Sequence, residues 1–167
     1  MMRKVIWLLI LFVVSVLTIV PALAQSAEPG APGIGDSLYP GFGNGGYDVQ
    51  HYTLNLYVQP GNGSLSGETI IEATATQTIS SFNVDLIGFR IMTITVDGEQ
   101  ADFSRDGQEL TITPAQPIAN GATFKTAISY GGIPEPLTSV AIPVPTGWVA
   151  YMGEGCPCSF VLSEPDG

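Results

Sequence analysis

The stretch HYTLNLYVQPGNGSLSGETIIEATAT, residues 51–76, decides the fold. In its first half, apolar residues alternate with more polar ones, and this period of two predicts a half-buried β-strand. The apolar set is Tyr52, Leu54, Leu56 and Val58. Pro60–Gly63 is a strong turn signal, and the alternation resumes from about Leu65 to Thr76. We therefore expect the two halves to form a long antiparallel hairpin.

Shorter segments with the same alternation follow the hairpin as far as Tyr130. They lie at 82–86, 92–96, 101–103, 110–112 and 124–130. Tight-turn pairs separate several of them, at Asp97-Gly98, Asp106-Gly107 and Asn120-Gly121. After residue 24 no segment keeps a period of 3.6 residues. Short strands with turns every roughly 8–12 residues predict an all-β fold, an antiparallel β-sandwich or folded sheet.

The C-terminal part has a different pattern. Residues 131–147 contain four prolines, which predict an irregular excursion. Two short strand-like pieces follow at 148–152 and 159–162, and the sequence finishes in a turn-like segment. We expect the β-domain to be incomplete at its C-terminal end.

The first 24 residues have the order of a secretory signal peptide. Basic residues at the start precede a 16-residue apolar run, and Ala22-Leu23-Ala24 is a small-x-small cleavage pattern. An uncleaved membrane anchor is the alternative, but the run is shorter than the ~20 residues that span a bilayer. We expect cleavage after Ala24, no stable membrane insertion afterwards, and a secreted, extracellular or cell-envelope protein.

The remaining chain divides at residue 46. Residues 25–46 are expected to be a flexible lead-in, with Gln25–Gly35 disordered because Ala, Pro, Gly and Ser dominate it. Gly41–Gly46 is a flexible turn, and it lacks the Lys-Ser/Thr and the helix of a phosphate loop. Residues 47–167 are expected to be the β-domain.

The charge excludes one class of partner. The formal net charge is −10 and becomes −12 without residues 1–24, since Arg3 and Lys4 are then lost. Such an acidic surface repels phosphate backbones, so we expect no nucleic-acid binding.

Metal-ligand and nucleophile patterns are sparse. Cys156 and Cys158 are separated only by Pro157, too tight a loop for a mutual disulfide, so we expect free or redox-active thiols or pairing with other cysteines. His51 is the only histidine, and a structural zinc site needs four ligands, so we expect a surface or structural role for it. Asp48 is expected to bond local backbone amides. No catalytic residue, metal site or cofactor site is predicted in this chain.

Two aromatic residues lie near the cysteines. Trp148 and Tyr151 are expected to pack under the Pro-rich segment, and a binding surface is the alternative.

The segment YPGFGNGGYDVQHY, residues 39–52, resembles the opening of bacterial aminopeptidase N-like enzymes. Leu65-Ser66-Gly67 resembles their "L-x-G" entry into the second strand, and residues 82–86 and 95–98 also fit. The resemblance implies a saddle-shaped N-terminal β-domain that packs on a helical catalytic domain. In that family the catalytic domain holds one zinc through H-E-x-x-H and a later Glu, and it removes N-terminal residues from peptides.

The single histidine means that H-E-x-x-H is absent from this chain. The resemblance therefore implies a chain truncated before the catalytic domain and inactive alone. Zinc, the catalytic domain as partner, and the peptide substrate would all belong to the missing part.

Glu164 is the one candidate site residue that the resemblance supplies. Family members carry a "T-Q-x-E" segment whose Glu binds the free α-amine of the substrate, and the sequence here is Val161-Leu162-Ser163-Glu164. Only the Glu carries over. A carboxylate facing an ammonium gives recognition by charge-assisted hydrogen bonding. A solvated turn residue beside Pro165 is the alternative.

A competing hypothesis is a free-standing secreted β-sandwich module that binds a protein, peptide or glycan. A truncated domain should instead expose an apolar patch where its partner packs, and should be marginally stable or self-associate. An independent enzymatic activity would need a nucleophile or metal set that the sequence does not show.

Overall fold

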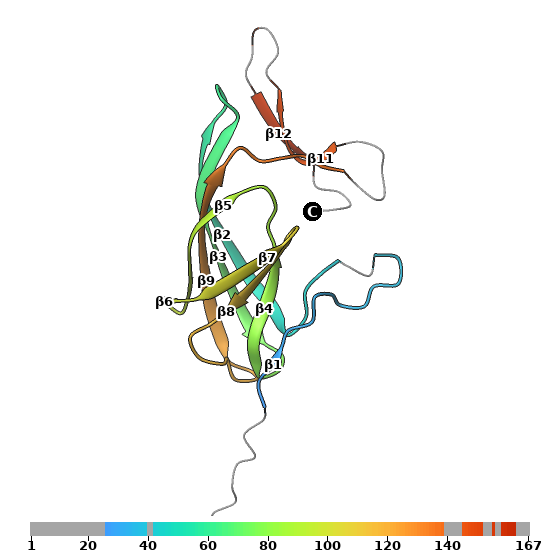
Figure 1. Cartoon of the computed structure of the whole chain (residues 1–167), viewed down its shortest axis with the longest axis vertical. Coiled ribbons are helices and arrows are strands. Elements are labelled where there is room, and N and C mark those ends of the chain that lie inside the picture. The colour runs from blue at the N-terminus through green and yellow to red at the C-terminus, as the bar shows by residue number, and fades with distance from the viewer. Residues whose placement is uncertain (1–25, 40–41, 139–144, 152–154, 156–157, 163–167) are drawn as a thin grey trace, which may run out of the picture.

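The computed structural model describes residues 26–39, 42–138, 145–151, 155 and 158–162, and everything described is strand, turn or loop. Three sheets form it (Figure 1). The predicted all-β fold is confirmed. Within the described residues, no helix has the length and apolarity needed to cross a membrane.

The largest sheet is a tall, curved wall of five antiparallel strands (Figure 1). In spatial order the strands are β2 (Tyr47–Gln59), β3 (Ser64–Ala75), β9 (Thr123–Gly132), β5 (Arg90–Val96) and β6 (Glu99–Gln100). β2 and β3 form the predicted long hairpin, with Tyr47 opposite Ala75 and Gln59 opposite Ser64. β2 is an outer strand, because its only strand partner among the described residues is β3.

A second sheet covers part of this wall. Its order is β1 (Glu28–Pro29), β4 (Ile79–Asp85), β8 (Glu109–Thr113) and β7 (Asp102–Asp106). A third sheet contains β10 (Leu137–Thr138), β11 (Pro145–Tyr151) and β12 (Cys158–Leu162). The two strand-like pieces predicted near the C-terminus are confirmed, although β11 begins inside the stretch that we expected to be irregular.

The core lies between the first two sheets. Three aromatic rings stand at its centre: Phe82 of β4 lies 5.3 Å from Phe124 of β9 and 5.5 Å from Tyr47 of β2, between ring centroids. Ile94, Leu110 and other aliphatic side chains complete it. Because Phe82 comes from one sheet and Phe124 from the other, this cluster joins the two sheets.

A β-bulge at Gln50 changes the pairing phase of β2. Val49 lies opposite Ala73 and His51 lies opposite Glu72, so Gln50 is the extra residue. As a result, odd-numbered residues before the bulge and even-numbered residues after it share the inner face of the sheet. Tyr52, for example, lies opposite buried Ile71.

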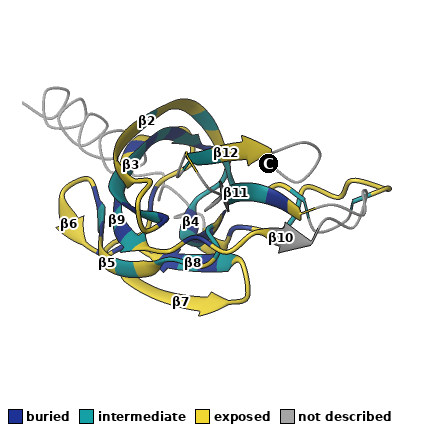
Figure 2. Cartoon of the chain, turned by 90° about the horizontal axis from the view of Figure 1, so that it is seen from above, coloured by how far each residue is buried: buried dark blue, intermediate teal, exposed yellow. Residues whose placement is uncertain are grey.

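The inner-facing residues after the bulge are nevertheless exposed. We call this row of four residues the β2 stripe. They are Tyr52 (52% exposed), Leu54 (59%), Leu56 (44%) and Val58 (37%). The prediction of a half-buried strand is therefore wrong for this part of β2. The reason is that the four-stranded sheet packs over the other end of the wall (Figure 1), and the four residues of the stripe keep more than a third of their surface exposed (Figure 2 colours exposed residues yellow).

The expected disorder of Gln25–Gly35 is also wrong in part. Residues 28–29 form β1, which runs parallel to β4. The Glu28 amide donates to the Thr78 carbonyl at 3.0 Å, and the Gly30 amide donates to the Ser81 carbonyl at 2.8 Å. Gly45 donates to the Ala31 carbonyl at 2.8 Å, so the Gly-rich turn folds back on this segment. Paired backbone of this kind is ordered structure.

Candidate functional site

The β2 stripe is the most conspicuous surface for binding. Four large apolar side chains in alternate positions of one strand form a continuous exposed row. Soluble domains seldom expose contiguous apolar rows of this kind unless something packs on them. The stripe carries no charge, so its chemistry suits a dry, apolar contact.

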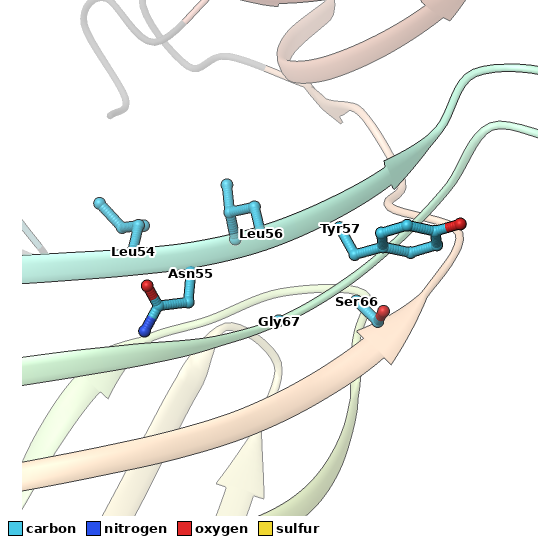
Figure 3. A pocket seen from close by; sticks show the side chains of 6 residues that line it. All are labelled: Leu54, Asn55, Leu56, Tyr57, Ser66 and Gly67. Carbon is cyan, nitrogen blue, oxygen red and sulfur yellow. The ribbon is translucent and has the colours of Figure 1, made fainter.

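Close backbone approach shapes this part of the hairpin. Gly67 of β3 lies opposite Leu56, and the Leu56 side chain covers it: a Cβ on Gly67 would stand 2.8 Å from Leu56 Cδ2 and would overlap the Asn55 carbonyl oxygen. An open depression of about 530 Å³ adjoins the same residues. Figure 3 shows Leu54 and Leu56 on one side of β2, and Asn55 and Ser66 on the other. The depression thus has residues of both faces and is not an enclosed ligand cavity.

The outer face of the sheet is polar. Lys125 Nζ lies 2.7 Å from Glu72 Oε1, and both side chains are about half exposed. This hydrogen bond to Lys125, followed by the charge of Lys125, lowers the pKa of the Glu72 carboxyl. His51 lies opposite Glu72 and is exposed, as the predicted surface role requires. This face has the character of a solvated surface.

Two carboxylates face each other at the end of the β4–β8 pair. Asp85 lies directly opposite Glu109, and Asn44 of the lead-in donates from Nδ2 to Asp85 Oδ2 at 3.1 Å. Burial raises the pKa of both carboxyls, and the charge of Asp85 raises that of Glu109 further. Glu109 Oε2 and Asn44 Oδ1 are buried without a hydrogen-bond partner in the described part of the chain. The sequence analysis missed this pair because its register depends on how β4 and β8 align.

Tyr47 ties β2 to the second sheet. Its hydroxyl donates to the Asn83 carbonyl oxygen at 2.6 Å, and burial is the main cause that raises its pKa far above the usual value. Asp48 behaves differently from the prediction: its carboxylate accepts from the Gln50 side-chain amide at 2.9 Å and not from a backbone amide. Both residues therefore serve the structure of the strand.

The residues singled out near the C-terminus are only partly described. Trp148 packs against the main core, and its Nε1 and the Ser159 hydroxyl are buried without a described hydrogen-bond partner. The predicted packing of Trp148 under the Pro-rich segment falls partly on residues 139–144, which lie outside the described residues. Cys158 opens β12 and is half-buried. Glu164 and Cys156 lie outside the described residues, as does the side chain of Tyr151.

The described residues do not fit a zinc site. No group of three or more His, Cys, Asp or Glu side chains gathers within this part of the chain. The acidic pair of Asp85 and Glu109 has the side-chain amides of Asn44 and Gln108 beside it, whereas zinc sites in proteins use three or four closely placed nitrogen, sulfur or oxygen ligands.

Comparison with solved structures gives matches over most of the chain. The M1 zinc metallopeptidase from Deinococcus radiodurans matches with a TM-score of 0.67 and 31% sequence identity, over 80% of this chain and 30% of that chain. A mutant of the M1 zinc metallopeptidase from the same organism, bound to a Tyr-Ser-Ala substrate, matches with a TM-score of 0.69 and 32% identity, over 81% of this chain and 30% of that chain. A two-domain M1 zinc metallopeptidase mutant bound to L-tryptophan matches with a TM-score of 0.71 and 32% identity, over 81% and 31% of the two chains.

The chain thus spans less than a third of the solved structures that it matches. No protein-family model matches it, and no curated protein does.

Proposed function

We propose that this chain, which is an N-terminal β-domain of the M1 zinc metallopeptidase family, serves as the non-catalytic domain of a zinc aminopeptidase that removes N-terminal residues from peptides. The main support is the match to M1 zinc metallopeptidases, which covers about four-fifths of this chain but less than a third of each metallopeptidase chain. Such a match supports a partner role beside a separate catalytic domain.

The β2 stripe is the proposed contact with that domain. It lies on the inner face of the curved sheet, beyond the edge of the second sheet, and is apolar along its whole length. Burial of apolar surface contributes roughly 25 cal/mol per Å², so covering four large side chains stabilises a domain interface by several kcal/mol before the costs of ordering. The polar outer face, with its ion pair between Lys125 and Glu72, would stay in solvent.

Zinc chemistry belongs to the catalytic domain in this proposal. A catalytic zinc there would polarise the peptide carbonyl and activate water. The described residues of this chain hold no group of three or more candidate ligands of their own. Glu164 is proposed to bind the substrate's amino terminus, as a carboxylate that accepts hydrogen bonds from an ammonium group.

Export completes the proposal. The basic, apolar and small-residue order of residues 1–24 supports cleavage after Ala24 and a secreted or cell-envelope location. The N-terminal sequence of the protein recovered from an expressing bacterium tests this. A mature form that begins at Gln25 supports it, and an uncleaved form in the membrane fraction contradicts it.

A domain-exchange experiment tests the main proposal. In the Deinococcus radiodurans M1 peptidase, the region that aligns with this chain is replaced by residues 25–167 of this chain, which include Glu164. Aminopeptidase activity on an aminoacyl p-nitroanilide is then measured, together with zinc content. We expect the chimera to keep measurable activity, because the matched fold presents the same face to the catalytic domain.

Two variants of the chimera locate the contact. Leu56→Asp puts a charge into the stripe and should reduce activity and thermal stability together. Tyr57→Asp is the matched control, because Tyr57 is the next residue, is 65% exposed and points to the opposite face. A zinc-loaded, folded chimera without activity, or equal effects of the two variants, would count against the proposed interface.

A further inference from the structure

The outer edge of β2 is a second unpartnered feature, separate from the stripe on its face. β2 is 13 residues long and is paired only along one side among the described residues. The backbone N–H and C=O groups of its other side are therefore open to another strand. An edge strand of this length is a template for pairing with another chain.

Natural sheets normally blunt such edges, and this chain does so elsewhere. The opposite edge of the same sheet is β6, only two residues long, with Glu99 in it. The edge strand β7 of the second sheet carries three charges in five residues, Asp102, Arg105 and Asp106. β2 has none of these devices after its bulge: residues 52–59 contain no charged residue and no proline. The β2 edge thus lacks the features that prevent pairing.

We infer that the β2 edge is a self-association surface, on which β2 of a second copy of this chain pairs antiparallel around a two-fold axis at Asn55. In this register Leu54 faces the partner's Leu56, and Tyr52 faces the partner's Val58. Every large apolar side chain of the stripe then meets another apolar side chain, and His51 meets the partner's Gln59. Cross-strand pairs of this kind are the unit that stabilises a sheet.

Self-complementarity is the reason to choose a second copy over an unrelated strand. A two-fold interface uses the same patch twice, so it requires that the sequence match itself read backwards. Residues 52–58 meet that condition on both faces of the strand. On one face the residues of the stripe meet those of the partner's stripe, and on the other face Thr53 meets the partner's Tyr57. The net charge of −10 repels copies in general, but the acidic Asp48 lies before the bulge and outside the paired segment.

The bulge at Gln50 limits the length of the junction. Pairing from His51 to Gln59 joins two five-stranded sheets into one continuous sheet, and both stripes lie on the same side of it. The stripe stays open to a catalytic domain, so this inference does not depend on the proposed function.

Asn55 gives a sharp test. At the two-fold axis Asn55 faces its own copy, so Asn55→Lys places two ammonium groups directly opposite each other, and like charges there are destabilising. Within one copy the same lysine would stand opposite Glu68 of β3, which favours the folded monomer. Ser129→Lys is the matched control, because Ser129 of β9 flanks Glu68 from the other side and lies away from the open edge.

The chain is produced from its full coding sequence, and sedimentation velocity is measured over a hundredfold range of concentration. We expect the parent and Ser129→Lys to form dimers as concentration rises, and Asn55→Lys to need at least tenfold more protein. Hydrogen exchange should show added protection in residues 51–59 of the dimer.

Three results overturn the inference. The first is a parent chain that stays monomeric over the whole range. The second is a dimer that Asn55→Lys leaves unchanged or that Ser129→Lys weakens equally. The third is a monomer whose β2 amides are protected by a copurified peptide, which would make the edge a peptide-binding site instead.

Discussion

Gly67→Ala tests the physical account of the hairpin most directly. Gly67 lies opposite Leu56 on neighbouring strands, and a Cβ at this position would overlap the Asn55 carbonyl oxygen and stand 2.8 Å from Leu56 Cδ2. The Leu56 side chain can rotate away, but the carbonyl is backbone and can move only if β2 separates from β3. Overpacking in a filled site costs about 1–3 kcal/mol, and we expect about 3 kcal/mol because the obstacle is backbone.

Urea unfolding followed by circular dichroism measures this loss. Gly61→Ala is the control, because Gly61 lies in the turn of the same hairpin and a Cβ there meets nothing within 4 Å. We expect that control to be neutral, or stabilising by roughly 0.5 kcal/mol through the unfolded state. If Gly67→Ala changes the free energy of unfolding by less than about 0.5 kcal/mol, β2 and β3 do not approach each other as described.

Three further predictions concern the core, the acidic pair and the bulge. Thr126 is fully buried, and its hydroxyl lacks a described hydrogen-bond partner. Thr126→Val should therefore raise the free energy of unfolding, measured in urea, by about 1 kcal/mol. A destabilised variant would mean that the hydroxyl has a hydrogen-bond partner after all. Burial raises the pKa of Glu109 and of Asp85 opposite it, so the folded state binds protons more tightly than the unfolded state. Proton binding therefore stabilises the folded state at low pH, and this stabilisation is lost as pH rises through the folded-state pKa values. Glu109→Gln should therefore stabilise the fold by roughly 0.5 kcal/mol at neutral pH, after solvent screening, and should have no effect once both carboxyls are protonated. Thermal unfolding at several pH values measures this, and a stabilisation that does not change with pH would contradict charge repulsion as its cause. Deletion of Gln50 should shift one half of β2 to the wrong face, and a variant that keeps cooperative unfolding and parental near-ultraviolet circular dichroism would show that the bulge is dispensable.

Local sequence signals predicted the strands and turns well because hairpins are made from local contacts. Asp97-Gly98 is an example: both residues adopt positive φ angles, 51° and 84°, as a tight two-residue turn between twisted strands requires. The alternation from Leu65 to Thr76 likewise predicted a strand, and in β3 it places Ile71 and Ala73 on one face, which is buried. In each case the residues that carry the signal are also those that make the contact.

Features that depend on distant pairing were not predictable in this way. β1 consists of Glu28 and Pro29 in a segment of disorder-prone composition, and it is ordered because the amides of Glu28 and Gly30 donate to carbonyl groups at Thr78 and Ser81, some fifty residues later. The acidic pair has the same origin, since Asp85 and Glu109 become neighbours only through the register of β4 and β8. Composition describes a segment, whereas these contacts belong to pairs of segments.

In β2, the bulge residue Gln50 separates a part of the strand that packs in the core from a part that is exposed. Alternation alone gives an apolar face to β2, but it does not say what covers that face. Before Gln50, Tyr47 and Val49 pack in the core, and after it the same face continues as the exposed stripe. The bulge keeps the apolar residues of both halves on the inner face, although they are odd-numbered before the bulge and even-numbered after it. Without it, an apolar row would point to the polar side that holds Lys125 and Glu72. An apolar row that extends beyond the reach of the second sheet is a surface on which a partner can pack, and this is the physical ground for the proposed contact with a catalytic domain.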